Sequence, residues 1–239
     1  KPLMTMLGAP SSGMSAPHGT GAGTQSGANQ AGNNLNGAQE IVPPVVEATD
    51  YELVTSKDRL AAWVAEAAHS GFVAVDTETT SLDSSIASLV GVSLATAPGR
   101  ACYVPLRHKG PAAAQGDLLG FEEETPDFAQ LDFDEAMGLL KPLFENPSVL
   151  KIGHNLKYDF HVLARAENGG ARLSPVDDTM CMSYVLDTGR VPRHSMDVLA
   201  DYWLSHKTVK YEDVCGKGKN QITFDALLPE AALEYAAED

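Results

Sequence analysis

The sequence predicts an α/β domain with one mixed central β-sheet flanked by helices, preceded by a disordered linker. Apolar runs bounded by polar residues indicate strands near 72–75, 89–95 and 101–105. From about residue 134 onwards, helix-like patterns alternate with one further apolar run at 149–152. A meander of strands followed by alternating helices and a strand is typical of a single mixed sheet.

Residues 1–48 are expected to be the linker and residues 49–239 the folded domain. Up to about residue 44 the chain is rich in Gly, Ser, Ala, Asn and Gln and is nearly free of charged and aromatic residues. Such a segment cannot bury enough apolar surface to offset its chain entropy, which favours a flexible linker. The remaining length fits one ordinary domain.

The individual elements follow from periodicity and from capping signals. The segment 58–69 predicts an amphipathic helix, because Leu60, Trp63, Val64 and Ala67 share one face. The other expected elements are turns at 83–85 and 97–99, a loop over 109–132, a helix over 134–145, a strand over 149–152, a helix over 158–167, a helix from the N-cap Asp178 to Leu186, a helix over 196–203, a loop over 207–221 and a last helix from about Pro229.

Composition narrows the classes of function. The longest apolar runs are shorter than a membrane span, so no membrane partner is expected. Three cysteines fit neither a zinc spacing nor a disulfide framework, which favours a reduced, cytoplasmic protein. The net charge of −15 argues against nucleic-acid binding by the chain as a whole, but residues 151–220 carry ten Lys and Arg against nine Asp and Glu. This weak electrostatic footprint suits a domain that holds only a few nucleotides.

Asp76 and Glu78 are the most informative pair in the sequence. They follow the apolar run 72–75 and are separated by one residue. Where the pleat of a strand breaks down at its end, two carboxylates at positions i and i+2 can converge on one point. They then repel each other and require a cation, and hard cations such as Mg²⁺ prefer oxygen ligands. Two solvated loop acids are the alternative for this pair taken alone.

Two further segments carry chemistry. Asp159 is expected on the first turn of a helix, where the helix dipole favours a carboxylate. Tyr235 and Asp239 are four residues apart and share one face of the last helix. The alternative for the first segment is an Asn155 N-cap followed by an ordinary helix acid, and for the second an ordinary acidic helix end.

Together and in this order, these segments resemble the three motifs of the DEDD nucleases, in the tyrosine-containing subclass (DEDDy). The stretches 75–82, 155–159, 193–200, 206–208, 216–221 and 235–239 also resemble the proofreading 3′→5′ exonuclease domain of bacterial DNA polymerase I. Gly-Lys-Gly-Lys-Asn-Gln at 216–221 favours that family over RNase D and RecQ-linked exonucleases. The resemblance implies a ribonuclease H-like fold and a 3′→5′ exodeoxyribonuclease that releases 5′-mononucleotides during replication and repair.

The resemblance also implies a metal centre. Two divalent ions, Mg²⁺ with Mn²⁺ or Zn²⁺ as alternatives, would be held by Asp76, Glu78, Asp159 and Asp239, with Asp76 as the bridging ligand. Tyr235 would orient the attacking water. A phenol with an ordinary pKa of about 10 is a poor general base but a suitable hydrogen-bond partner for that water.

Several residues are candidate contacts to the single-stranded 3′ end of DNA. Leu82 resembles a residue that wedges against the terminal base, with a core leucine as the alternative. Asn155 caps its helix or touches the substrate. Arg193 and the two lysines Lys217 and Lys219 are expected on backbone phosphates.

Phe224 is the nearest candidate for stacking on a base, with a packing role as the alternative.

The expected partner besides DNA is a covalently attached polymerase domain. In the polymerase I family a linker at this position joins the 5′-nuclease domain to the exonuclease domain, and the last helix continues beyond the final motif. The chain would then be a piece of a longer, monomeric protein. Two alternatives are a catalytically silent structural module and an RNase D-like exoribonuclease. The four acids and the tyrosine argue against the first, and the lysine-glycine loop against the second.

Overall fold

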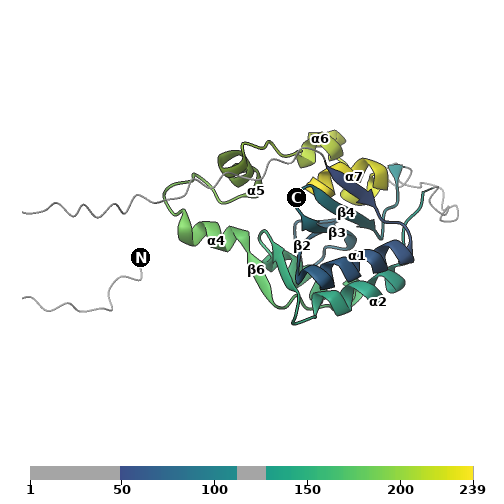
Figure 1. Ribbon diagram of the computed structural model, residues 1–239. Coiled ribbons are helices and arrows are strands. Elements are labelled where there is room, and N and C mark those ends of the chain that lie inside the picture. Colours follow the sequence, from purple (N-terminus) through teal and green to yellow (C-terminus); the bar gives the residue numbers. More distant parts are fainter. Residues whose placement is uncertain (1–48, 112–127, 239) are drawn as a thin grey trace, which may run out of the picture. The chain divides into compact units, whose positions relative to one another are not determined.

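The computed structural model describes residues 49–111 and 128–238 (Figure 1). The expected linker, part of the expected loop over 109–132, and Asp239 lie outside these residues. The sheet has six strands in the order β1-β4-β3-β2-β5-β6. β2 is antiparallel to β3, and β3 to β4, whereas the β1–β4, β2–β5 and β5–β6 pairs are parallel. The predicted mixed sheet is confirmed. The strands are β1 (Asp50–Leu53), β2 (Phe72–Thr79), β3 (Leu89–Ala97), β4 (Arg100–Pro105), β5 (Leu150–Gly153) and β6 (Val176–Asp178).

Helices cover both faces of this sheet (Figure 1). α1 packs beside α2 on one face, and α7 packs against β1, β3 and β4 on the other. The helices are α1 (Lys57–Ser70), α2 (Phe133–Phe144), α3 (Lys157–Ala164), α4 (Thr179–Leu186), α5 (Met196–Leu199), α6 (Tyr211–Cys215) and α7 (Pro229–Glu238), with short turns η2 (Ala166–Asn168), η3 (Ala200–Leu204), η4 (Gly218–Asn220) and η5 (Phe224–Ala226). Among the described residues, no helix is both long enough and apolar enough to cross a membrane.

The alternation of side chains along the strands divides the core in two. On β4, Cys102 and Val104 belong to the larger cluster beneath α1 and α2, whereas Tyr103 between them belongs to the smaller cluster beneath α7. Period-2 alternation produces this division, because successive residues of a strand point to opposite faces. The smaller cluster is rich in aromatic rings, and the candidate active site lies on its side of the sheet.

Most of the expected elements are confirmed, including α1, α2, α4, α7 and the strand β5. β1 and β6 were not predicted, because each has at most four residues and lacks an apolar run; pairing with β4 and β5 stabilises them. The loop expected over 207–221 contains α6, and the helix expected over 196–203 is an α-helical turn followed by a π-helical one. The strand expected to end at residue 75 continues to Thr79, which changes how the site is built.

Candidate active site

Asp76 and Glu78 lie inside β2. The sequence had predicted that they would lie just after the end of this strand. They converge because residues two apart in a strand share a face. The Cα partners across β3 are Ser93 for Asp76 and Gly91 for Glu78. A β-bulge follows immediately, between Glu78 and Thr79. Glu78 is only 7% exposed, so its carboxylate is held within the protein and not in a solvated loop.

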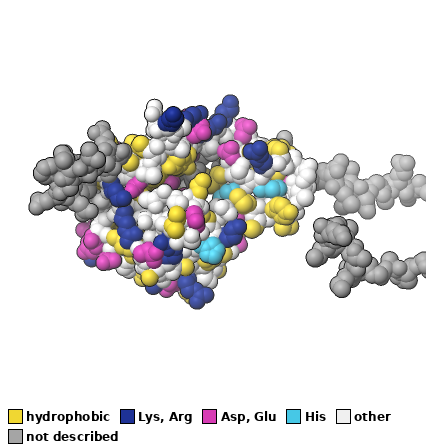
Figure 2. Space-filling view, turned by 180° about the vertical axis from the view of Figure 1, so that it is seen from behind, with side chains coloured by type: hydrophobic (Ala, Val, Ile, Leu, Met, Phe, Trp, Pro, Cys, Tyr) yellow, Lys and Arg dark blue, Asp and Glu magenta, His cyan; other side chains and the backbone are white. Residues whose placement is uncertain are grey.

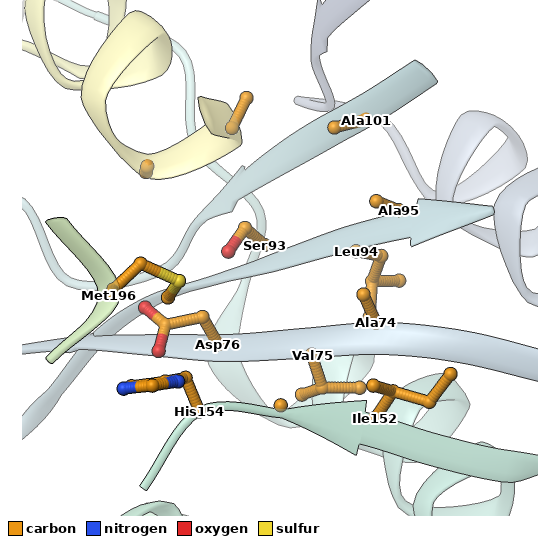
Figure 3. Close-up of a pocket in the computed structure, with 13 residues that line it drawn as sticks. Ala74, Val75, Asp76, Ser93, Leu94, Ala95, Ala101, Ile152, His154 and Met196 are labelled. Atoms are coloured by element: carbon orange, nitrogen blue, oxygen red, sulfur yellow. The ribbon is translucent and has the colours of Figure 1, made fainter. Parts of the chain in front are cut away.

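Asp76 lines a pocket to which β2, β3, β4 and β5 contribute residues. Its carboxylate lies beside the ring of His154 and the side chain of Met196 (Figure 3). Ala236 and Ala237 of α7 also line this pocket, so the helix that carries Tyr235 covers the same face of the sheet as Asp76. The first and third motifs therefore meet on one side of the sheet.

His154 is a neutral neighbour of Asp76. Its Nε2 lies 2.9 Å from the carbonyl oxygen of His194, so Nε2 donates to that oxygen, and its Nδ1 lies 2.9 Å from the hydroxyl oxygen of Thr179. Burial lowers the pKa of His154, which keeps the ring uncharged. Both ring nitrogens are occupied, so His154 orients the turn before α3.

Asp159 occupies the first turn of α3, as predicted, and is 2% exposed. The hydroxyl of Thr77 donates a 2.5 Å hydrogen bond to its Oδ1. Burial raises the pKa of Asp159 to about 6, against the lowering effect of the Thr77 hydrogen bond. A neighbouring positive charge would favour the ionised form of this carboxylate.

Tyr158 lies near all three carboxylates. Burial raises the pKa of its phenol, and the charges of Asp159, Asp76 and Glu78 raise it further, while a hydrogen bond with Thr79 lowers it. All three acids therefore lie within electrostatic range of the Tyr158 phenol.

They do not form a ready-made metal cluster. Within residues 49–111 and 128–238, no group of three or more His, Cys, Asp and Glu side chains has an arrangement that could hold a metal ion. The hydrogen bond from Thr77 holds Asp159 against β2, and Asp239 lies outside the described residues. The ligand set stays a prediction.

α7 is held along its buried face and at its C-terminal end. Ala232, Ala236 and Ala237 are buried against the sheet, and the half-buried ring of Tyr235 packs against other aromatic rings. At the far end, Glu238 accepts hydrogen bonds from the backbone N–H of Val209 at 2.6 Å and from Nε2 of His206 at 2.7 Å. The segment around residues 206–209 therefore anchors the residue that directly precedes Asp239.

The structure separates the alternatives for two candidate DNA contacts. Leu82 is 98% exposed, so it is not a core residue, and the wedge hypothesis stays open. Asn155 adopts a left-handed conformation with φ 60°, and it precedes the N-cap position of α3, which is Leu156 and has no side-chain cap. Asp178 accepts hydrogen bonds from the backbone N–H of Asn155 and Leu156, and from those of Met180 and Cys181 at the start of α4. One carboxylate thus joins the starts of two helices, a role that the sequence did not predict.

The basic candidates lie on the surface. Arg193 and Lys219 are exposed, and Lys217 forms an exposed ion pair of 2.6 Å with Glu212. On the face seen in Figure 2, basic and acidic side chains are interspersed, without one continuous basic patch. This distribution agrees with the weak electrostatic footprint inferred from the charge count.

The stacking role predicted for Phe224 is wrong. The residue is 0% exposed and is surrounded by the rings of Tyr103, His108, Tyr211 and Tyr235, at centroid distances of 5.7–6.5 Å. A fully buried ring offers no face to a nucleotide base. Phe224 is instead the centre of the aromatic cluster on which Tyr235 rests.

The sequence resembles known exonucleases over most of its length. The sequence model of one protein family, described as 3′-5′ exonuclease, matches residues 51–239. DNA polymerase I of Pseudomonas aeruginosa is 42% identical over 212 residues, covering 89% of this chain and 21% of that protein. DNA polymerase I of Rhizobium leguminosarum is 45% identical over 186 residues, covering 74% and 17%. The chain thus spans about a fifth of the length of these curated relatives.

Solved structures with the same fold include Brucella melitensis NrnC bound to pGG, with a TM-score of 0.52, 22% identity and coverage of 80% of this chain and 75% of that one. Escherichia coli RNase D, an exoribonuclease involved in structured RNA processing, gives a TM-score of 0.53 at 18% identity, covering 80% and 41%. These likenesses confirm the ribonuclease H-like fold. Because the family match runs from residue 51 to residue 239, this chain belongs to the 3′-5′ exonuclease family and is similar to the exonuclease domain of DNA polymerase I.

Proposed function

We propose that this chain is a 3′→5′ exodeoxyribonuclease that removes 5′-mononucleotides from the single-stranded 3′ end of DNA. The observation that carries the proposal is the shared face of β2: Asp76 and Glu78 lie on it, and α7 brings Tyr235 to the same side. A phosphodiester on that face would meet carboxylates from one element and a phenol from another. The sequence similarity to polymerase I supports DNA as the substrate.

The donor set fits hard divalent cations. Asp76, Glu78 and Asp159 offer only carboxylate oxygens, the type of ligand that Mg²⁺ and Mn²⁺ prefer. Burial raises the pKa of Asp159, and a bound cation would offset that effect. We propose that these acids, with Asp239, hold two ions, with Zn²⁺ as a further alternative. When bound, such ions neutralise charge on the phosphate and favour formation of hydroxide from water.

The protein's own residues would perform the remaining tasks. Tyr235 would hold the attacking water by a hydrogen bond, since a phenolic hydroxyl both donates and accepts hydrogen bonds. Leu82, almost fully exposed beyond the end of β2, would wedge against the terminal base. The DNA nucleotides that precede the terminal one would be contacted by Asn155, Arg193, Lys217 and Lys219.

The parent protein would also contain a polymerase. The curated relatives are DNA polymerase I proteins of which this chain covers about a fifth, so we propose a covalently attached polymerase domain. The exonuclease would then proofread ends that the polymerase extends. A cytoplasmic location and a monomeric state complete the proposal.

The test uses a 5′-labelled single strand of DNA and an RNA strand of the same sequence, each with Mg²⁺ or Mn²⁺. The proposal predicts a ladder of shortened DNA strands, release of 5′-mononucleotides, and much slower loss of RNA. Faster loss of RNA would favour the RNase D-like alternative. No cleavage of either strand by a folded protein that also lacks affinity for Mn²⁺ by calorimetry would support the silent-module alternative.

A further inference from the structure

The smaller core cluster contains a buried hydrogen-bonded chain that leads from the sheet to α7. The phenol oxygen of Tyr103 lies 2.7 Å from Nε2 of His108, and Nδ1 of His108 lies 2.9 Å from the carbonyl oxygen of Leu227. Tyr103 is 0% exposed and His108 is 2% exposed. Leu227 lies two residues before Pro229, the first residue of α7.

The hydrogen-bonding partners of the His108 ring determine which of its nitrogens carries the proton. A carbonyl oxygen only accepts, so Nδ1 of His108 donates to Leu227, and Nε2 of the neutral ring accepts the hydroxyl proton of Tyr103. Burial lowers the pKa of His108, which favours this neutral form. The single proton on the ring is thus directed at the backbone that enters α7.

Tyr103, the first residue of this hydrogen-bonded series, lies close to the candidate active site. Tyr103 is the Cα partner of Ser93, which in turn is the partner of Asp76, so the three residues form one row across the sheet. The ring of Tyr103 extends over Gly91, the partner of Glu78, where an added Cβ would lie 2.2 Å from the phenol oxygen. Tyr103 therefore needs the glycine opposite Glu78 in order to reach His108.

Neighbouring contacts reinforce the same connection. The backbone N–H groups of Lys109 and Gly110 both donate to the carbonyl oxygen of Asp225, at 2.7 and 3.2 Å. Nζ of Lys109 forms a 3.0 Å ion pair with the buried carboxylate of Asp225. Gln130 holds the backbone of His108 from both sides, at 2.9 and 3.1 Å. Residues 108–110 therefore clamp the segment that precedes α7.

We propose that His108, held by Tyr103, is a positioning residue for Tyr235. It fixes the entry of α7 through Leu227 and packs against Phe224, whose ring lies 5.7 Å from that of Tyr235. The inference rests on the proposed function only in the role of Tyr235; the structural connection stands independently of it. An error of about 1 Å in a group that orients a reactant can cost up to roughly a hundredfold in rate.

The test compares His108→Leu, which removes both hydrogen bonds, with His108→Asn, whose side-chain amide retains a donor near the position of Nδ1. His108→Leu should lower kcat by roughly ten- to a hundredfold with KM nearly unchanged. His108→Asn should recover part of this loss. Thr96→Val is the matched control, because it removes a buried hydroxyl from β3 that bonds Glu66, away from α7. Tyr103→Phe replaces His108→Leu if the latter does not fold.

A double-mutant cycle decides whether His108 acts through Tyr235. If it does, His108→Leu should cause little further loss of kcat in a Tyr235→Phe background, because the hydroxyl that it positions is already absent. Losses that multiply would overturn the proposal. Hydrogen exchange of the α7 amides gives a readout that does not depend on catalysis: it should accelerate in His108→Leu and not in Thr96→Val. Unchanged exchange in a folded His108→Leu protein would also overturn the proposal, whereas absence of wild-type cleavage with accelerated exchange would contradict only the proposed function.

Discussion

The hydroxyl of Thr77 donates a 2.5 Å hydrogen bond to the carboxylate of Asp159, 82 residues away in sequence. Thr77 lies between Asp76 and Glu78 on β2 and points to the opposite face of the strand. The first motif therefore uses both faces of one strand: two carboxylates on one side, and on the other a hydroxyl that holds the acid of the second motif.

Replacing Thr77 tests this connection. Thr77→Val keeps the shape of the side chain but removes the side-chain hydrogen bond to a buried carboxylate, so the free energy of unfolding should fall by about 1–3 kcal/mol. Thr77→Ser retains the hydroxyl and should stay much closer to the wild type. Urea denaturation followed by circular dichroism measures both. Equal losses for the two variants would show that packing of the threonine methyl group matters more than the hydrogen bond.

Gly91 should not tolerate a side chain. An added Cβ would lie 2.2–2.5 Å from three atoms of the Tyr103 ring, so Gly91→Ala should reduce the free energy of unfolding by about 1–3 kcal/mol through overpacking. Gly138→Ala is the control: it lies in α2 with no atom within 4 Å of the added Cβ, and alanine favours the helix by about 1 kcal/mol. Opposite shifts in the urea midpoint are therefore expected, and a stable Gly91→Ala protein would contradict the packing described for Tyr103.

Acid stability should depend on Glu66. Arg100 forms two hydrogen bonds with its carboxylate, at 2.7 and 2.8 Å, and Thr96 adds one at 2.5 Å. The Arg100 and Thr96 hydrogen bonds lower the pKa of Glu66 from 4.5 to about 2. A lowered pKa stabilises the folded state fully above the ordinary value, and this stabilisation is lost as the pH falls from about 4.5 to about 2.

Glu66→Gln should therefore be less stable near neutral pH and lose less stability on acidification. The pair is about one-third exposed, so solvent screening reduces the size of the effect. Glu135→Gln is the control, because that carboxylate makes a single exposed ion pair of 3.3 Å with Lys57. If acidification lowered the free energy of unfolding equally in the wild type and in Glu66→Gln, the result would argue against this role of Glu66.

Tyr235→Phe should slow turnover while leaving substrate binding nearly unchanged. The phenylalanine ring keeps the packing against Phe224 and Tyr211, and only the hydroxyl is lost. Loss of one positioning hydrogen bond in a transition state costs about 3 kcal/mol, or roughly a hundredfold in kcat. Single-turnover kinetics and DNA affinity should be measured together. A large loss of affinity at unchanged turnover would assign Tyr235 to binding instead.

The sequence predicted those parts of the fold that depend on local signals. The apolar face of α1, the position of α2, the N-cap of α4 by Asp178 and the strand leading to Asp76 all follow from short-range patterns. β6 was missed because Val-Asp-Asp has no strand signal of its own and forms only through pairing with β5.

The parts of the site that depend on distant contacts were predicted less well. The sequence left both stacking and packing open for Phe224, because its burial comes from rings at positions 103, 108, 211 and 235, which no local pattern connects. The hydrogen bond between His108 and Leu227 spans 119 residues and had no sequence signal. Asp76 and Glu78 were correctly paired on one face, although regular strand alternation and not a broken pleat brings them together.

The central claim is that the carboxylates on β2 perform the cleavage, and Asp76→Ala tests it most directly. With a 5′-labelled single strand and Mg²⁺, the folded variant should show no cleavage above background, because the proposed bridging ligand is lost. Asp58→Ala, which removes an exposed acid from α1, should cleave like the wild type. Wild-type cleavage by a folded Asp76→Ala protein would contradict the account.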